Sequence, residues 1–317
     1  MSKTALLMMS LVLALGSTQA APKSPRALNS IGVSLGNLKN PFFYQMSKAI
    51  ERRALQLSPA VKVNSMSADY DLERQKAQIE GFIRDRVDLI ILNAVDSVKI
   101  APVIQKARAA GVRVVAVDVG AEGGVDLTVT SDNVLAGRQA CEHLVQLTAG
   151  RGNYVILNGP PVTAITDRVA GCKSVLARYP QIRVISSRLN AGGARDGGAL
   201  AMQKVLATGI KVSAVFAIND PTGIGAAQVL QSAGLGNIPL TAVDGAPDAQ
   251  VMLGAKHSNF RATAAQFPFQ MAYRAVDEGL RLVRGETLER NIVKIPTRLI
   301  TQKNLKEYVG WQKLPRE

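Results

Sequence analysis

Several short apolar runs of this 317-residue chain end in an asparagine or an aspartate. Asn93 follows "IIL", Asp118 follows "VVAV", Asn219 follows "AVFAI" and Asp244 follows "LTAV". Amide and carboxylate groups exchange hydrogen bonds with hydroxyl groups, whereas a phosphate or carboxylate ligand requires several Arg and Lys side chains. The pattern therefore favours a neutral, hydroxyl-rich ligand. A single Asn or Asp is also common at turns and helix N-termini. The inference of a ligand site therefore depends on the repeated occurrence of these residues at the ends of apolar runs.

Two of the seven Phe residues, Phe42 and Phe43, stand side by side after Asn40 and Pro41. Asn40 is a suitable cap for a helix that begins with Pro41. Two adjacent rings on a helix cannot both point into the core by periodicity alone. The apolar C–H face of a sugar packs well on an aromatic ring, so we predict that one ring or both contact a ligand.

The segments between these residues alternate between apolar, β-branched runs and amphipathic helical patterns. This alternation predicts an α/β fold with parallel sheets that are covered by helices on both faces. A polar, Thr-rich stretch at 126–133 interrupts the rhythm, and two later extended segments, 261–267 and 291–300, allow the chain to return. We therefore predict two doubly wound, Rossmann-like lobes joined by a hinge with several crossings.

The same breaks in pattern suggest the extent of each lobe. We expect residues 28–130 and 267–296 to form the N-terminal lobe, and residues 131–266 and 297–317 to form the C-terminal lobe. In open parallel sheets, ligands bind just outside the carboxyl ends of the strands. The residues that end the apolar runs should therefore face a shared ligand site.

The first 20 residues have the features of a secretory signal peptide. Lys3 precedes an apolar run at 5–15, and small residues lead to a cleavage point after Ala20. No Cys lies near that point, so we expect a periplasmic protein without a lipid anchor. Cys141 and Cys172 suit one disulfide in an exported protein, although two buried, reduced thiols are also compatible with the sequence.

Other classes of function find little support. The formal charge is +14, but the basic residues are dispersed, so nucleic acid is not an expected partner. The chain has only two histidines, His143 and His257, and neither a P-loop nor a G-x-G-x-x-G after its first apolar run. We therefore expect no enzyme activity, no metal and no cofactor.

Six motifs occur in series along the chain: "NPFF" (40–43), "AVD" (116–118), "SDNVLAG" (131–137), "AVFAIND" (214–220), "VDGAPDA" (243–249) and "ATAAQFP" (262–268). In this respect the sequence resembles the ribose-type periplasmic sugar-binding proteins, which are solute receptors of bacterial sugar ABC importers. The resemblance implies the type I periplasmic binding fold. It also implies a monomer that captures a monosaccharide or sugar alcohol and delivers it to an ABC transporter permease in the inner membrane.

The resemblance further implies a set of ligand contacts. The positions that match, or that stand at or beside a family contact, are Asn40, Phe42, Phe43, Asp118, Thr166, Arg168, Asn219, Asp244 and Gln266. Thr166 stands where the family has an arginine, and Arg168 either replaces that group or begins a helix. Val119 follows Asp118 where ribose binders have a second arginine, and glycines replace an aromatic residue of the second lobe. These departures favour a sugar or polyol other than ribose.

Two related functions share the expected fold. A lac-repressor-type regulator would need an N-terminal helix-turn-helix, and this chain has the predicted export signal there. A periplasmic sugar receptor for a chemoreceptor or sensor kinase would have the same pocket as an importer receptor. The sequence leaves that second alternative open.

Overall fold

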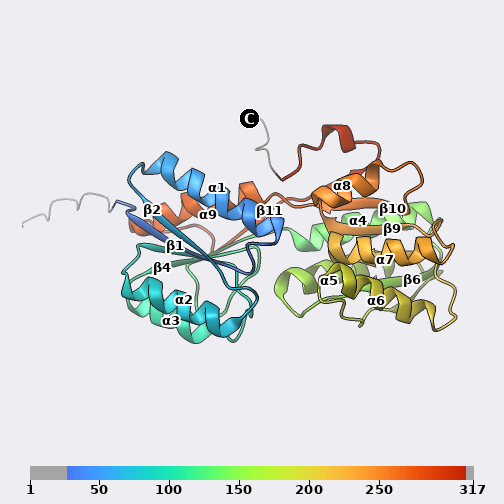
Figure 1. Ribbon diagram of the computed structural model, residues 1–317, viewed down its shortest axis with the longest axis horizontal. Helices are drawn as coiled ribbons and strands as arrows, with labels where there is room; N and C mark the ends of the chain where they lie inside the picture. The colour runs from blue at the N-terminus through green and yellow to red at the C-terminus, as the bar shows by residue number, and fades with distance from the viewer. Residues whose placement is uncertain (1–26, 312–317) are drawn as a thin grey trace, which may run out of the picture.

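A computed structural model describes residues 27–311, which form two lobes, each built on one six-stranded sheet (Figure 1). The first sheet has the strand order β11-β5-β4-β3-β1-β2, and all of its neighbouring strands are parallel. Its strands are β1 (Ser30–Leu35), β2 (Lys62–Ser67), β3 (Leu89–Leu92), β4 (Arg113–Val117), β5 (Leu127–Ser131) and β11 (Ile292–Ile295).

Helices cover both faces of this sheet, as a parallel sheet requires. Helices α1 (Pro41–Leu57) and α9 (Pro268–Val283) lie on one face, and α2 (Leu72–Arg84) and α3 (Ala101–Ala109) lie on the other (Figure 1). Alternate residues of β3 serve the two faces. Leu89 and Ile91 belong to the core under α1 and α9, whereas Ile90 and Leu92 belong to the core under α2 and α3. This two-sided burial explains why the strand is apolar throughout.

The second sheet has the strand order β12-β10-β9-β8-β6-β7, and only the edge pair β10–β12 is antiparallel among its described strands. Its strands are β6 (Gly152–Leu157), β7 (Ile182–Ser186), β8 (Ala214–Ala217), β9 (Leu240–Asp244), β10 (Phe260–Ala265) and β12 (Arg298–Thr301). Its helices are α4 (Asn133–Leu147), α5 (Thr163–Leu176), α6 (Arg195–Leu206), α7 (Asp220–Ser232), α8 (Pro247–Gly254) and the 3₁₀ turn η1 (Leu305–Glu307).

Helices α4 and α5 pack closely on one face of the second sheet. Gly137 of α4 lies against the backbone of Arg168, and Gly171 of α5 lies against the backbone of Val134, where neither position has room for a methyl group. A disulfide joins the same two helices between Cys141 and Cys172, whose Cα atoms are 5.2 Å apart. Of the two states that the sequence allowed for these cysteines, the structure contains the bridged one.

The chain passes between the two sheets three times within the described residues. The passages lie between β5 and α4, between β10 and α9, and between β11 and β12. The predicted fold class, two doubly wound α/β lobes joined by several crossings, is confirmed. None of the described helices combines the length and apolar character that a membrane span needs. The predicted signal peptide at 1–20 lies outside the described residues.

Candidate functional site

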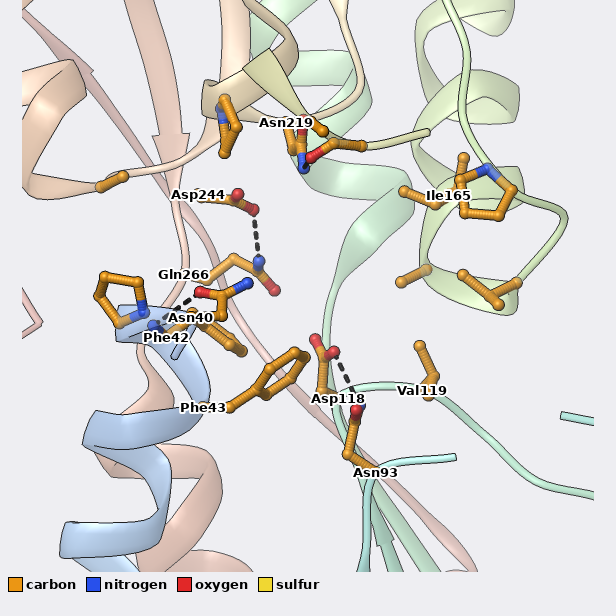
Figure 2. Close-up of a pocket in the computed structure, with 18 of the residues that line it drawn as sticks. Asn40, Phe42, Phe43, Asn93, Asp118, Val119, Ile165, Asn219, Asp244 and Gln266 are labelled. Carbon is orange, nitrogen blue, oxygen red and sulfur yellow. Dashed lines mark hydrogen bonds between the residues drawn. The ribbon is translucent and has the colours of Figure 1, made fainter. Parts of the chain in front are cut away.

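A cleft of about 710 Å³ lies between the two lobes, at the carboxyl ends of strands from both sheets. This is the position at which open parallel sheets bind ligands. Figure 2 shows labelled side chains from both lobes turned toward a common space. Eight of the nine ligand-contact residues predicted from the sequence line the cleft: Asn40, Phe42, Phe43, Asp118, Arg168, Asn219, Asp244 and Gln266.

The N-terminus of α1 supplies the aromatic wall of the N-terminal lobe. The side chain of Asn40 caps the helix, since its Oδ1 accepts a hydrogen bond from the backbone N–H of Phe42 at 3.0 Å. The rings of Phe42 and Phe43 stand edge to face, with centroids 5.5 Å apart. Both rings are buried and both line the cleft, so the adjacent pair forms one wall rather than one core ring and one exposed ring.

Asp118 follows β4 and faces these rings (Figure 2). Its φ of 66° lies in the left-handed region, which Asp tolerates better than most residues. The side-chain amide of Asn93 donates to Asp118 Oδ2 at 3.1 Å and holds the carboxylate in place. The pKa of Asp118 is raised to about 6, mainly because the carboxyl group is buried.

Asp244 ends β9 in the opposite lobe, and its backbone has a φ of 135°. Its Oδ1 accepts from Gln266 Nε2 at 2.7 Å and from the Arg168 guanidinium at 3.2 Å. Burial raises the pKa of Asp244, and the positive charge of Arg168 opposes that effect. Asp220 lies behind Asp244 and accepts from the Thr263 hydroxyl at 2.7 Å; burial raises the pKa of Asp220 as well.

Arg168 is a cleft residue, although the sequence left open whether it only begins a helix. It lies in the middle of α5 and is 3% exposed. Besides Asp244, its guanidinium donates to Asn133 Oδ1 at 2.9 Å and to the backbone oxygen of Ile218 at 2.8 Å. These three acceptors hold a permanent positive charge beside the buried carboxylates.

Thr166 is the predicted contact that the structure does not bring to the cleft. It is exposed on α5, and its hydroxyl donates to the backbone oxygens of Val162 and Thr163 one turn earlier. A helix rotates each residue by about 100°, so positions two apart, such as Thr166 and Arg168, face nearly opposite directions. The expectation for Thr166 is therefore corrected.

Asn219 and Gln266 complete the polar lining. Asn219 caps α7, with its Oδ1 accepting from the backbone N–H of Thr222 at 3.1 Å and its Nδ2 donating to the backbone oxygen of Gly193 at 2.9 Å. Gln266 is 3% exposed, and its Oε1 has no hydrogen-bond partner among the described residues. A buried amide oxygen without a partner is costly, so Gln266 offers an acceptor to a ligand hydroxyl.

Sequence reasoning missed several residues that line the cleft. Tyr70 receives a hydrogen bond from the side chain of Asn40 at 3.4 Å, and Trp311 joins the aromatic wall from the C-terminal end of the described chain. Ile165 forms an apolar side of the cleft together with Val119, which the sequence presented only as a departure from the family pattern (Figure 2). One feature of the sequence could have drawn attention to Trp311, because it is the only tryptophan of a chain with few aromatic residues.

The described residues contain no cluster of three or more His, Cys, Asp or Glu side chains that could hold a metal ion. The cleft instead combines three aromatic rings of the Phe and Trp type with several amides, the charged groups of Asp118, Asp244 and Arg168, and an exposed Arg195–Asp248 ion pair. Carboxylate and amide oxygens accept hydrogen bonds from hydroxyl groups, and Arg168 and amide N–H groups donate to hydroxyl oxygens. The rings supply flat apolar surfaces for C–H groups. This chemistry matches a small polyhydroxylated molecule.

Comparison with known proteins identifies the family. Residues 31–287 match the model of the periplasmic binding protein domain family. The ribose import binding protein of Bacillus subtilis is 30% identical over 276 residues, which cover 86% of this chain and 88% of that protein. A xylitol-binding protein of Mycolicibacterium smegmatis is 30% identical over 261 residues, which cover 80% and 74%.

A solved structure leads to the same family. The ABC transporter solute binding protein of Bacillus halodurans with bound myo-inositol has a TM-score of 0.81 and 25% identity, and the match covers 90% of this chain and 99% of that one. The chain belongs to the periplasmic binding protein domain family, and the resemblance predicted from the six motifs is confirmed.

Proposed function

We propose that this protein is a periplasmic solute-binding protein that captures a monosaccharide or sugar alcohol between its two lobes and delivers it to an ABC transporter permease. The observation that carries the proposal is the convergence of Phe42, Phe43 and Asp118 from one lobe with Asn219 and Asp244 from the other on a single cleft. The ligands for which its relatives are named, or which they hold, are ribose, xylitol and myo-inositol, and all three are neutral and rich in hydroxyl groups.

Each part of the cleft has a place in this function. Phe42 and Phe43 would pack on the C–H groups of the ligand, while Asp118, Asp244 and the unpaired Oε1 of Gln266 would accept from its hydroxyls. Arg168 would donate to a ligand oxygen. Contacts from both lobes favour the closed state, because a ligand shifts a hinge equilibrium only through its additional affinity for that state.

The lobes already touch beside the cleft. The backbone N–H of Gly120 donates to the hydroxyl of Thr163 across the lobe boundary at 3.1 Å. Val119 and Ala164 belong to the same apolar cluster although they come from different lobes. Such contacts can form only when the lobes approach, so they would stabilise the closed, loaded form that a permease recognises. The protein would act as an exported monomer, with residues 1–20 as its cleaved signal peptide.

The experiment is a thermal-shift and calorimetry screen of the purified mature chain with D-ribose, xylitol and myo-inositol, since a specific ligand raises the melting temperature. We expect at least one of them to bind. Asp244→Ala should weaken that binding at least 100-fold, because it leaves Arg168 and Gln266 without their shared acceptor. Asp126→Ala, which removes a carboxylate that pairs with Arg108 and Arg113 and does not line the cleft, is the control for a general loss of stability. Undiminished affinity in Asp244→Ala would contradict the proposed site.

A further inference from the structure

Trp311 lies at the end of the described chain and reaches back into the cleft. After η1, the C-terminal segment turns from the outer side of the C-terminal lobe toward the junction between the lobes (Figure 1). The Trp311 side chain lines the cleft and is 5% exposed. A large aromatic ring buried in an irregular segment outside the helices and strands needs specific partners to remain there.

The partners of Trp311 belong to both lobes. Its ring meets the ring of Phe42 edge to face, with centroids 5.2 Å apart. Its indole Nε1 donates to the backbone oxygen of Asp244 at 2.9 Å. One side chain therefore contacts an aromatic residue of the N-terminal lobe and the backbone of a carboxylate residue of the C-terminal lobe.

The backbone at Asp244 requires such support. Asp244 has a φ of 135° and Gly245 a φ of 74°, and the first value is unfavourable for a residue with a side chain. The C-terminal segment donates to both carbonyls, from Trp311 to Asp244 and from the Tyr308 hydroxyl to Gly245 at 2.9 Å. The carboxylate direction follows from the backbone dihedrals of Asp244 itself. The bond from Trp311 to the Asp244 carbonyl therefore helps to aim the carboxylate into the cleft, whereas the bond from Tyr308 holds the following residue.

Trp311 also supplies the C-terminal lobe with an aromatic side chain in the described lining of the cleft. The loop after β7 also lines the cleft and has glycines at 192 and 193, and a methyl group at Gly192 would meet no atom within 4 Å. Among the described residues that line the cleft, the other aromatic side chains, Phe42, Phe43 and Tyr70, all come from the N-terminal lobe. Trp311 is therefore the only aromatic side chain that the C-terminal lobe contributes to the described part of the lining.

We propose that Trp311 is a ligand-positioning residue, which forms the aromatic wall of the C-terminal lobe and holds the Asp244 carboxylate in its binding direction. The proposal rests on the proposed function, because it names a further residue of the same ligand site. A ligand between the lobes would lie within a partial cage of Phe42, Phe43 and Trp311. Binding would then be coupled to the C-terminal segment.

The affinity test compares two tail variants of the full mature chain. Trp311→Phe keeps a ring but removes the N–H that reaches Asp244, and Tyr308→Phe removes the matching bond to Gly245 from a side chain that does not line the cleft. Both variants should lower the melting temperature. Calorimetry with D-ribose, xylitol and myo-inositol should show a Kd about 10-fold higher for Trp311→Phe with the sugar or polyol that binds wild type. Tyr308→Phe should stay within about twofold, since its lost bond holds Gly245 rather than Asp244 and its ring does not line the cleft.

A fluorescence arm tests the position of Trp311 without any ligand. Emission reports on this residue alone because the chain has one tryptophan. Phe42→Leu removes the ring that covers the indole, so it should shift emission to the red and increase quenching by acrylamide. Phe82→Leu is the matched control, because Phe82 is a buried residue of α2, on the other face of the first sheet.

The outcomes separate the two proposals. If a probe stabilises the wild-type protein and Trp311→Phe keeps its full affinity, the positioning role is wrong and the proposed function stands. Emission unchanged by Phe42→Leu would place Trp311 away from the cleft and overturn the inference independently of any ligand. A wild-type protein that responds to none of the three probes overturns the proposed function and the positioning role with it.

Discussion

Replacement of Asp118 by Asn should make the ligand-free protein more stable and the ligand site weaker. Burial is the main cause that raises the pKa of Asp118 from its ordinary value of 3.8 to about 6. A carboxyl group with a raised pKa holds its proton more tightly in the folded state than in the unfolded state. The free energy of unfolding therefore falls as the pH rises from about 4 to 6, and it stays low above that range.

The magnitude follows from the pKa difference. A difference of about 2 between the folded and unfolded states corresponds to about 3 kcal/mol of lost stability at pH 7.5. Asn has the same shape as Asp, carries no charge and tolerates the left-handed backbone of this position. It also keeps an oxygen for the Asn93 amide, which donates at 3.1 Å. We expect Asp118→Asn to gain about 2–3 kcal/mol at pH 7.5 and little at pH 4.

Urea unfolding of the ligand-free protein at pH 4, 5, 6 and 7.5 provides the assay, with the change between wild type and variant plotted against pH. Asp126→Asn is the control, because the Asp126 side chain is 5% exposed but is paired with Arg108 at 3.3 Å and Arg113 at 3.2 Å. Loss of that carboxylate should destabilise the protein at pH 7.5. A variant Asp118→Asn that is less stable than wild type at pH 7.5, or whose stability difference does not vary with pH, refutes the reasoning.

Three further predictions concern binding and stability. Affinity for a neutral sugar or polyol should fall as the pH drops below about 6, because a ligand hydroxyl that donates to Asp118 or Asp244 favours the ionised carboxylates. Binding then releases protons, and calorimetry between pH 5 and 8 measures whether the affinity rises or falls with pH. Cys141→Ser should cost about 3–4 kcal/mol, since the bridge to Cys172 spans 31 positions of the sequence, and reductant should destabilise wild type but not the variant. Gly137→Ala should lower the melting temperature strongly and weaken binding, because the added methyl group collides with the α5 backbone at Arg168, whose guanidinium enters the cleft. A crystal structure and a melting curve that match those of wild type would contradict this.

Local patterns in the sequence were enough to predict the architecture. Apolar runs buried on both faces, short connections and the polar break at 126–133 predict two wound lobes, because each signal depends on residues near one another in the chain. The strand ends carry the same local information. Asp118 and Asp244 could be assigned to a shared edge, since parallel strands always bring their carboxyl ends to one side.

The tertiary structure decided which neighbours of those residues enter the cleft. Thr166 and Arg168 are two positions apart, and the rotation of α5 turns only Arg168 toward Asp244. Tyr70 reaches Asn40 through a loop conformation that its residue types do not specify. The pKa of Asp118 likewise depends on burial between two lobes, which no local pattern measures.

The sequence by itself determined the periodicity, the strand ends and the aromatic pair Phe42–Phe43, because these follow from the spacing of side chains along one element. Only the folded chain decided that Trp311 lies against Phe42, which is 269 positions away (311 − 42). Such a contact depends on three passages between lobes and on the course of the C-terminal segment. Long-range packing of this kind is the sum of many weak interactions, and no single stretch of sequence records it.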